Sequence, residues 1–417
     1  MAGLPQAATA ENEFQRVLHD RLLRTVFQPI VSVGSGEVIG YEGLVRGPVG
    51  SILESPDALI KEAYRENRVV EFDWIARASA SRAALAAGLS SDDLLFLNIE
   101  PLALASDAPP DLWPVIEEAF QKLRVVLEVT ERSLDRDPST LLEGIDRQRS
   151  TVAAVALDDV GADIRTMSML PALEPDVIKL DLKVTQRALS RKAMKILDFV
   201  YEEVERTDAT VLAEGVETKR HEQIVRELGC PLAQGWLYGK PTDQPAPTGQ
   251  HQATELLERN VALEEVRSPF EALGGHTISH ASTEFLYSFA NQVFTGGIHL
   301  LDPALALMLV PSPELLDRRA LDVLSRWAGK RVVAGALGRG VPAEPAPGVR
   351  GSWVHDPLLD GEWASIALSP STAVAILARL IPGTKSQFEF GVTHDRRRII
   401  AAARCLLRRL GPRPDEK

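Results

Sequence analysis

Cysteine is nearly absent from this sequence. Only Cys230 and Cys405 occur among its 417 residues, and they lie far apart in no metal-ligand pattern. The spacing excludes a metal site built from cysteines. The small number is typical of a protein from a reducing compartment and not of a disulfide-stabilised secreted domain.

Long apolar runs and an excess of positive charge are also missing. No uninterrupted apolar run is long enough to cross a bilayer. The opening stretch MAGLPQAATAENEFQ has no basic segment followed by an apolar one, so we predict no signal peptide. The formal net charge of −12 argues against a general binder of DNA, RNA or membrane surfaces. A phosphate-bearing small molecule is not excluded, because a metal ion can reverse the local field. We therefore expect a cytoplasmic protein without a membrane span.

Residues 20–242, in contrast, contain a regular alternation of apolar strand-like runs and amphipathic helical stretches. This alternation favours parallel strands joined by crossover helices, and the nearly continuous apolar character of the runs is expected for strands covered on both faces. With roughly eight such runs, a TIM-like (β/α)8-type barrel fits better than a small open sheet. The runs are TVFQPIV, EVIGYEGLV, LLFLNI, VVLEVT, VAAVALDD, DVIKLD, TVLAEG and AQGWLYG.

A chain of 417 residues is expected to hold two domains. The stretch GKPTDQPAPTGQH at 239–251 has the composition of a linker, and a connecting helix is predicted after it. The remaining pattern predicts a smaller α/β domain, with helices at HTISHASTEFLYSFANQV and RRRIIAAARCLLRRL and strands at GGIHLLDP, KRVVAGALG, SWVHDPL, EWASIALS and QFEFGVTHD. We therefore predict five segments, namely an N-terminal extension at 1–19, the barrel at 20–245, a linker with connecting helix at 246–267, the second domain at 268–412 and a tail at 413–417.

Almost every predicted strand of the first domain ends in a carboxylate, amide or amine. In a (β/α) barrel the carboxyl ends of the strands build the active site, so these groups should converge on one rim. Any one of them alone has a plainer explanation, because an acidic residue after a strand often caps a helix. The set consists of Glu42, Arg46, Asn98, Glu128, Glu131, Asp158, Asp159, Lys179, Asp181, Glu214, Glu217 and Gln234.

The adjacent pair Asp158 and Asp159 is the most informative member of this set. In a regular strand, neighbouring side chains point to opposite faces. A lone Asp-Asp pair is most simply a solvated turn, but several carboxylates around one mouth repel one another unless cations lie among them. Hard oxygen ligands suit Mg²⁺ or Mn²⁺ and not zinc. Two such ions bridged by one carboxylate form the arrangement used for phosphodiester cleavage.

Residues 20–242 resemble an EAL domain, the bacterial cyclic di-GMP phosphodiesterase, which acts in second-messenger signal transduction. The naming motif stands here as EGL at 42–44, and the other motifs follow in the family's order along the whole domain. The matching stretches are FQPIV (27–31), YEGLVRG (41–47), LNIEP (97–101), LEVTE (127–131), LDDVG (157–161), IKLD (178–181), AEGVET (213–218) and LGCPLAQGWLYGKP (228–241).

The resemblance implies a role for each matching residue and hydrolysis of cyclic di-GMP to linear pGpG. Two Mg²⁺ or Mn²⁺ ions would be held by Glu42, Asn98, Glu128, Asp158 and Asp159, with Asp158 bridging them. The resemblance further implies that Glu214 and Glu217 complete the second metal site and orient the attacking water, and that Lys179 contacts that water or the scissile phosphate. It implies that Gln234 positions the water or metal-bound solvent and that Gln28, Leu44 and Arg46 bind the nucleotide. Glu131 would anchor the loop after Asp159. A homodimer through the barrel is also implied.

The loop after the paired aspartates departs from the family. Its usual stretch reads DDFGTGYSS, whereas this chain has DDVGADIRT. Val160 replaces an aromatic residue, Asp163 replaces a glycine whose backbone angles aspartate adopts less easily, and Arg165 adds a charge. Gly43 in place of alanine removes only a methyl group. The loop change leaves the ligand set intact but bears on the rate of turnover and its regulation.

Residues 268–412 resemble the DICT sensory domain that is found attached to cyclic di-GMP enzymes. The stretches FTGGIHLLDPALAL (294–307) and FGVTHDRRRIIAAARCLL (390–407) carry this resemblance. His276 and His280 are four residues apart and could share a helix face, where they could bind a metal or haem. No cysteine pattern or acidic cluster accompanies them, so locally hydrogen-bonded histidines are the simpler expectation. We expect a sensory or interaction role toward a ligand or protein that the sequence does not identify.

Three functions of different classes are compatible with this set. The first is a metal-dependent phosphodiesterase regulated by the C-terminal domain, which the complete ligand set favours. The second is a non-catalytic cyclic di-GMP receptor that uses the same pocket, which the altered loop leaves open. The third is a protein-interaction scaffold, which would be expected to have lost Arg46 and Gln28 as well.

Overall fold

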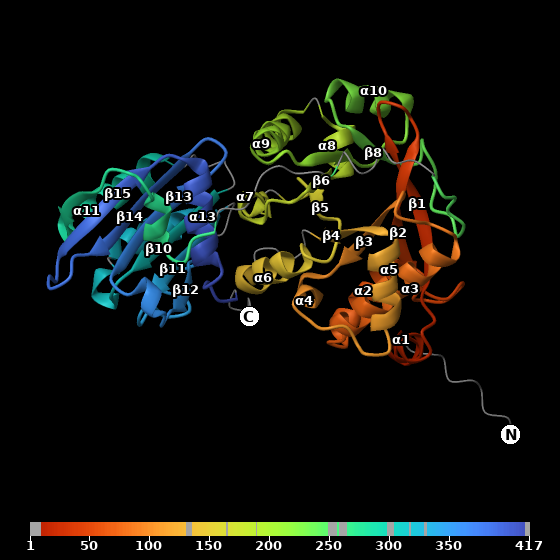
Figure 1. Ribbon diagram of the computed structural model, residues 1–417, viewed down its shortest axis with the longest axis horizontal. Coiled ribbons are helices and arrows are strands. Elements are labelled where there is room, and N and C mark those ends of the chain that lie inside the picture. The colour runs from red at the N-terminus through yellow and green to blue at the C-terminus, as the bar shows by residue number, and fades with distance from the viewer. Residues whose placement is uncertain are drawn as a thin grey trace.

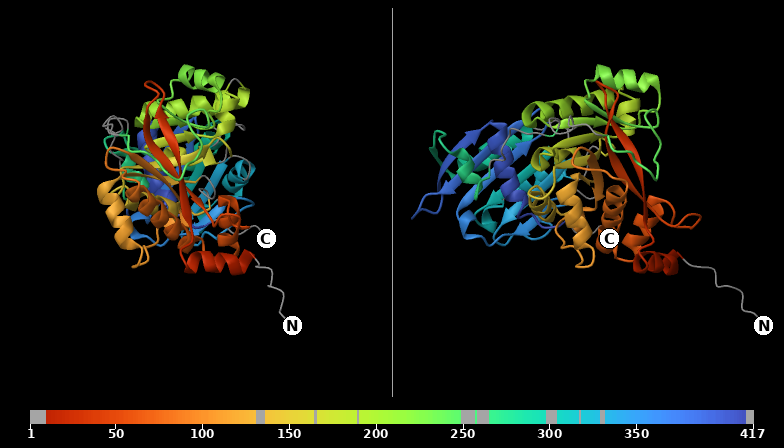
Figure 2. Two further views of the ribbon diagram at one scale, coloured as in Figure 1. Left: turned by 90° about the vertical axis from the view of Figure 1, so that its right-hand side faces the viewer. Right: turned by 45° about the vertical axis from the view of Figure 1, so that its right-hand side comes forward.

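The computed structural model shows two α/β parts that pack against each other (Figures 1 and 2). It describes the chain except residues 1–9, 131–135, 164–165, 189, 249–256, 258–264, 298–303, 317, 329–331 and 413–417. The GGIHLLDP stretch, expected as a strand, falls mostly outside the described residues. No described helix is long and apolar enough to span a bilayer.

The first part is a closed barrel of eight strands in sequential order, as the alternating pattern predicts. Helices surround the strands, so each strand is buried on both faces and reads as a continuous apolar run. The strands are β1 (Arg24–Ser32), β2 (Val38–Arg46), β3 (Leu94–Ile99), β4 (Arg124–Val129), β5 (Ala154–Val160), β6 (Val177–Leu180), β7 (Thr210–Ala213) and β8 (Leu232–Gln234).

The expectation of a wholly parallel barrel is wrong for the first strand. β1 runs antiparallel to both of its neighbours, β2 and β8, whereas all other adjacent pairs of the barrel are parallel. The reason is the connection, because the segment 33–37 between β1 and β2 is far too short for the crossover that parallel neighbours require. As a result, Gln28 lies opposite Glu42 in the ladder.

The helices of the barrel begin with polar side chains that accept hydrogen bonds from the first-turn N–H groups. Ser55, Asp137, Ser190 and Thr218 each cap a helix in this way. The first helix packs on the barrel's flank, with Phe14 fully buried. The helices are α1 (Ala10–His19), α2 (Pro56–Arg65), α3 (Val69–Ala86), α4 (Pro101–Leu104), α5 (Trp113–Lys122), α6 (Pro138–Gln148), α7 (Leu170–Leu173), α8 (Leu182–Gln186), α9 (Arg191–Thr207) and α10 (Lys219–Glu227), with a 3₁₀ turn η1 (Thr166–Ser168) before α7.

The second part is a seven-stranded mixed sheet in the order β12-β11-β10-β13-β14-β15-β9. β11, β13 and β15 match expected strands and β12 overlaps one in part, but β10 and β14 were not among the expected strands. β9 lies in a stretch expected to be helical, so His280 is on a strand and not on a helix with His276. The elements are η4 (Pro269–Leu273), β9 (Ser279–Ser282), α11 (Thr283–Gly297), β10 (Ala304–Val310), η5 (Pro313–Leu315), α12 (Arg318–Trp327), β11 (Val332–Gly338), β12 (Arg350–Trp353), η6 (Pro357–Leu359), β13 (Glu362–Leu368), β14 (Ala373–Leu380), β15 (Gln387–Thr393) and α13 (Arg396–Leu407).

The sheet of the second part is covered on both faces. Alternate residues of β10 belong to two different cores, because side chains alternate along a strand. Ala306 and Met308 pack in the core that contains residues of α11 and α12. Leu305 and Leu307 pack in the core that contains α13 and that is continuous with the barrel's outer layer. Figure 1 shows α13 between the sheet and the barrel helices α6 and α7. The two parts therefore share apolar packing and do not merely touch.

Candidate active site

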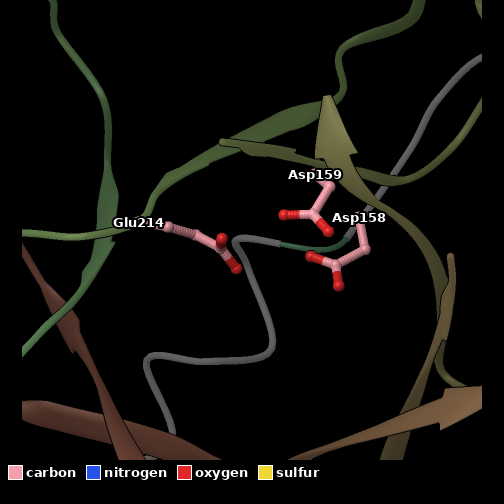
Figure 3. Close-up of side chains that lie close together, drawn as sticks. All are labelled: Asp158, Asp159 and Glu214. Atoms are coloured by element: carbon pink, nitrogen blue, oxygen red, sulfur yellow. The ribbon is translucent and has the colours of Figure 1, made fainter. Parts of the chain in front are cut away.

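A β-bulge brings the adjacent aspartates to the same place. Leu157 pairs with Ile178, but Val160 pairs with Leu180, so β5 has one more residue than β6 over this interval. An extra residue bends the strand and re-aims its side chains. Asp159 takes up the change with a φ of 54°, which is uncommon for a residue other than glycine. The expectation that the two side chains point to opposite faces is therefore wrong, since carboxylate oxygens of both lie within 4.8 Å of each other and of Glu214 (Figure 3).

Lys179 is the cationic centre of the site. Its side chain extends from β6 into the barrel and is fully buried. The Nζ atom lies 2.7 Å from Oε1 of Glu128, 2.8 Å from Oδ1 of Asp158 and 2.8 Å from Oε1 of Glu214. A fourth carboxylate, Glu42, is 3.7 Å from the same atom. Four strand ends thus meet at one ammonium group, as the convergence argument predicts.

Two amides hold the carboxylate of Glu42. Asn98 Nδ2 donates to Oε1 over 3.0 Å, and Gln234 Nε2 donates to Oε2 over 2.8 Å. Asn98 comes from β3 beside Glu128 in register, while Gln234 ends β8 on the other side of β1. Because each carboxylate oxygen has its own donor, Glu42 has a defined orientation at the barrel mouth.

The carboxylates outnumber the cation, and their pKa values show the imbalance. Burial and the neighbouring charges of Glu42 and Asp158 raise the pKa of Glu128 well above its ordinary value, despite the attraction of Lys179. Burial likewise raises the pKa of Glu214. For Lys179, burial alone would lower the pKa, but the attraction of the surrounding carboxylates outweighs it, and the pKa is well above its ordinary value. The protein alone therefore leaves this site short of positive charge.

The donor set fits a hard divalent cation. Both carboxylate oxygens of Glu128 and Oδ1 of Asp158 are buried and accept no hydrogen bond from the described residues, although Oε1 of Glu128 and Oδ1 of Asp158 are ion-paired with Lys179. Buried acceptors of this kind are costly unless a cation or donor satisfies them. Carboxylate and amide oxygens are the ligands that Mg²⁺ and Mn²⁺ prefer. Asp158, Asp159 and Glu214 form the one described group whose ligand atoms are close enough together to hold an ion.

A cavity of about 210 Å³ opens beside the acidic cluster. Its lining includes Glu42, Asn98, Asp158 and Asp159, several apolar side chains such as Leu44, and further polar side chains. Such a half-polar, half-apolar cavity suits a ligand with a charged part and a flat apolar part.

The other predicted nucleotide-binding residues lie on the adjoining strands β1 and β2. Gln28 is half-buried and opposite Glu42 in the ladder. Arg46, also half-buried, donates from Nη1 to the carbonyl of Val45 over 2.8 Å. Burial and the nearby charge of Arg24 lower the pKa of Arg46. Neither Gln28 nor Arg46 is among the residues that line the cavity beside Leu44.

Three of the candidate residues stand apart from the cluster. Glu217 is exposed, three positions beyond Glu214 on the loop before α10, and its carboxylate is not in the described ligand group. Asp181 accepts a hydrogen bond from the N–H of Lys183 and caps α8, which is the plainer role of an acid after a strand. Glu131, the predicted loop anchor, lies outside the described residues.

The sequence reasoning missed further polar groups that line the cavity. Asp73 and Arg77 of α3 are buried, form an ion pair and both line the cavity, as does Glu100. The backbone N–H of Glu100 donates to Oδ1 of Asp73 over 2.8 Å. The signal was available, because an acid and a base four positions apart on one helix face are neighbours. Their apolar surroundings in the sequence gave no hint that the pair faces a cavity.

Known proteins resemble this chain over the barrel. The curated relatives include a probable cyclic di-GMP phosphodiesterase, PdeB, from Escherichia coli K12, which is 29% identical over 254 residues covering 57% of this chain and 46% of the relative. The cyclic di-GMP phosphodiesterase RocR from Pseudomonas aeruginosa PAO1 is 28% identical over 249 residues, covering 58% of this chain and 62% of RocR. The chain thus spans less than two thirds of the length of either relative.

Solved structures are similar over the same part. The EAL enzyme Bd1971 with cAMP and cyclic di-GMP has a TM-score of 0.49 and 21% identity, covering 56% of this chain and 66% of that one. Klebsiella pneumoniae BlrP1 with manganese and cyclic di-GMP has a TM-score of 0.45 and 27% identity, covering 53% of this chain and 56% of that one.

The family model described as EAL domain matches residues 11–241, which include α1 except its first residue, all eight barrel strands and the whole acidic cluster. This match covers more than half of the chain. The protein belongs to the EAL domain family.

Proposed function

We propose that this protein is a divalent-metal-dependent phosphodiesterase that opens cyclic di-GMP to linear pGpG and whose C-terminal domain regulates that activity. The observation that carries the proposal is the meeting of Glu42, Glu128, Asp158 and Glu214 at one buried ammonium group, Lys179. An acidic site this deficient in cations attracts metal ions and, through them, a phosphate. The names of the relatives point to the same substrate.

The residues divide into metal ligands and groups that meet the substrate. Glu42, Asn98, Glu128 and Asp158 would hold one ion, and Asp158 with Asp159 would hold the other, completed by Glu214 and Glu217. When bound, these ions would supply an activated water at neutral pH and offset the charge that develops on the phosphate. Lys179 is placed to donate a hydrogen bond to that water or to a phosphate oxygen. Gln234, which donates to Glu42 over 2.8 Å, would position the water or metal-bound solvent.

The nucleotide would lie across the barrel mouth. Arg46 would donate charged hydrogen bonds to the second phosphate, which is the strongest kind of contact available to that group. Leu44 would pack against a base in the cavity, and Gln28 would bind beside Glu42. The cavity's apolar lining supports this placement, because a base needs a flat, desolvated surface on one side.

The decisive experiment mixes purified protein with cyclic di-GMP and Mg²⁺ or Mn²⁺ and follows pGpG by chromatography. The proposal expects metal-dependent formation of pGpG that EDTA abolishes. Binding of cyclic di-GMP without product would support the non-catalytic receptor instead. Absence of both binding and product would refute the phosphodiesterase and the receptor and would leave the protein-interaction scaffold.

The altered loop is expected to limit turnover more than binding. Replacing Val160 with Phe and residues 162–166 with Thr-Gly-Tyr-Ser-Ser should raise turnover of cyclic di-GMP several-fold while its dissociation constant changes little. The reason is that Glu42, Asn98 and Glu128 lie outside the loop, whereas Asp159 depends on it, and a group that acts mainly in the transition state changes kcat more than affinity. Steady-state kinetics and isothermal titration calorimetry measure the two quantities.

The matched control for the loop exchange changes Val160 to Phe alone, which alters packing at one buried position. Unchanged turnover in the full exchange, or a gain that tighter substrate binding explains completely, would show that the loop does not have this role.

The barrel is expected to fold and bind nucleotide without the second domain. Residues 1–250 contain every candidate site residue, and the barrel closes within them. Removal of the second part exposes apolar side chains of η1 and α7, so solubility should fall while the Kd for cyclic di-GMP changes little. Calorimetry on the truncated and full-length chains makes the comparison. A soluble, folded truncation that no longer binds nucleotide, while the full chain binds it, would contradict this prediction.

The remaining proposals concern assembly and context. We propose a homodimer through the barrel, a cytoplasmic location, and a sensory role for the C-terminal domain toward a ligand or protein not yet identified. Light scattering on the purified chain determines the oligomeric state.

A further inference from the structure

The second domain contacts the barrel directly downstream of the metal-ligand candidate Asp159. From Asp159 the chain passes through Val160 and Gly161 to η1 and then to α7. η1 contacts β10 of the second domain, and α7 contacts α13. Met167, Met169 and Leu170 of this short segment are buried in the same apolar core as residues of β10 and α13. The segment η1–α7 therefore has barrel on one side and the second domain on the other.

Arg404 is the polar part of this contact. It lies on α13, is 3% exposed, and donates from Nη1 to the carbonyl of Ala172 near the end of α7. Its Nη2 donates to both carboxylate oxygens of Asp146 on α6, over 2.8 and 3.0 Å. The last carbonyls of a helix have no partner within the helix, so a buried donor at this place satisfies an acceptor that would otherwise be unpaired.

Groups from both domains hold Asp146, the partner of Arg404, and the end of α7. Arg408, the C-cap residue that follows α13, donates to Asp146 over 2.6 Å, and Ser139 of α6 donates to the carbonyl of Arg408 over 2.6 Å. On the barrel side, Arg149 donates to the carbonyls of Leu173 and Glu174 that follow Ala172. Arg206 of α9 also donates to the carbonyl of Pro171 over 3.4 Å, so the end of α7 is held by two arginines from the barrel and by Arg404 from the second domain.

The chain before η1, at Asp159 and Gly161, carries backbone strain. Asp159 adopts a positive φ of 54°, and Gly161 follows with a φ of 100° in a place where a Cβ would lie 2.7 Å from a methyl group of Val184. A non-glycine residue keeps such a conformation only when the surrounding structure determines it. Asp158 and Val160 on either side of Asp159 are held by β5, Val160 being buried and paired with Leu180 of β6, and the next apolar anchor described after Gly161 is the buried segment η1–α7.

We infer that Arg404 is a positioning residue for the second metal site, because it holds the segment η1–α7 and through it the conformation of Asp159. A signal received by the C-terminal domain would then act on catalysis by moving α13 against α7. The catalytic part of this inference rests on the proposed phosphodiesterase function. The structural part, that Arg404 orders η1–α7, does not.

The experiment compares full-length Arg404→Gln with Arg396→Gln. Arg396 also lies on α13 and crosses the interface, but it pairs with Glu202 of α9 and not with α7. Three quantities are measured, namely Mn²⁺ binding by electron paramagnetic resonance, kcat and Kd for cyclic di-GMP, and hydrogen exchange of residues 157–173. Arg404→Gln is expected to weaken Mn²⁺ binding and lower kcat by about three- to thirtyfold, the range that coupling through packed elements spans. The Kd should change little, and exchange in 166–173 should rise.

Arg396→Gln is expected to leave Mn²⁺ binding, kcat and exchange in 166–173 as in the wild type. Equal effects of the two variants would overturn the inference, as would an Arg404→Gln protein with wild-type Mn²⁺ binding and exchange. If Arg404→Gln does not fold, Arg404→Lys replaces it, because lysine keeps the charge for Asp146 but has one nitrogen where the guanidinium uses Nη1 for Ala172 and Nη2 for Asp146. A wild type that neither binds Mn²⁺ nor forms pGpG would refute the proposed function, whereas the exchange data would still decide whether Arg404 orders the segment.

Discussion

Asp158→Ala is expected to abolish hydrolysis of cyclic di-GMP, with kcat reduced by about a thousandfold or more. The proposed function assigns this carboxylate to both metal ions, and metal coordination stabilises a transition state by several kcal/mol. A loss of about 4 kcal/mol corresponds to three powers of ten in rate. The side chain is also one of the contacts of Lys179, at 2.8 Å, so its removal changes both the ligand set and the orientation of the ammonium group. Glu42→Ala and Glu128→Ala are expected to lose activity for the same reason.

Asp176→Asn is the matched control for Asp158→Ala. Asp176 is a part-buried acid directly before β6, at the other end of the strand from the site, where it pairs with Arg149 at 3.1 Å and accepts a hydrogen bond from the N–H of Val155. Its substitution should lower the melting temperature but preserve kcat. Pre-steady-state assays with saturating Mn²⁺ make the comparison. Substantial turnover by folded Asp158→Ala would refute the two-metal site.

Lys179→Met is expected to destabilise the metal-free protein strongly and to make its stability depend on metal. The ammonium group is the cation nearest to four carboxylates, and it is fully buried. Removing one partner of a buried ion pair typically costs about 3–5 kcal/mol, because the remaining charge is left uncompensated. Divalent cations at the same carboxylates would replace much of the lost attraction. Saturating Mn²⁺ should therefore raise the melting temperature of the variant far more than that of the wild type.

Activity should not return with the stability. If Lys179 donates a hydrogen bond to the attacking water or the phosphate, kcat of Lys179→Met stays low even with saturating Mn²⁺. Lys183→Met is the control, since Lys183 is exposed on α8 at the same rim. Calorimetric melts with and without Mn²⁺, followed by assays on the same samples, separate the two effects. Equal Mn²⁺-induced shifts in Lys179→Met and wild type would contradict the role of Lys179 as the charge that balances the site.

The outcome for the active-site residues shows how far strand-end reasoning reaches. A carboxylate, amide or amine after an apolar run is visible in one dimension, and the topology of a barrel turns a list of such residues into a ring. Glu42, Asn98, Glu128 and Lys179 came together for that reason. Glu217 and Asp181 satisfied the same pattern, yet one is exposed and the other caps α8. The pattern marks the rim of the barrel but does not say which side chains turn inward.

The bulge in β5 could not be predicted from the local sequence. Alternation along a strand predicts that Asp158 and Asp159 face apart, and only the pairing with β6 reveals the bulge that brings them together. A bulge depends on the register of two strands distant in sequence, so no window around LDDVG contains the information. The direction of β1 is different, because the shortness of the connection at 33–37 was visible and forbade the parallel arrangement.

By itself, the sequence determined the barrel and the polar groups at the ends of its strands. These properties depend on hydrophobic periodicity and on which residue types end each strand, both of which are local. The tertiary structure alone decided that one ammonium group sits among four carboxylates, that a bulge joins Asp158 to Asp159, and that Arg404 reaches Ala172 across 232 positions of the chain. The physical reason is that charge balance, strand register and helix docking depend on contacts between distant residues, whose geometry exists only once the chain has folded.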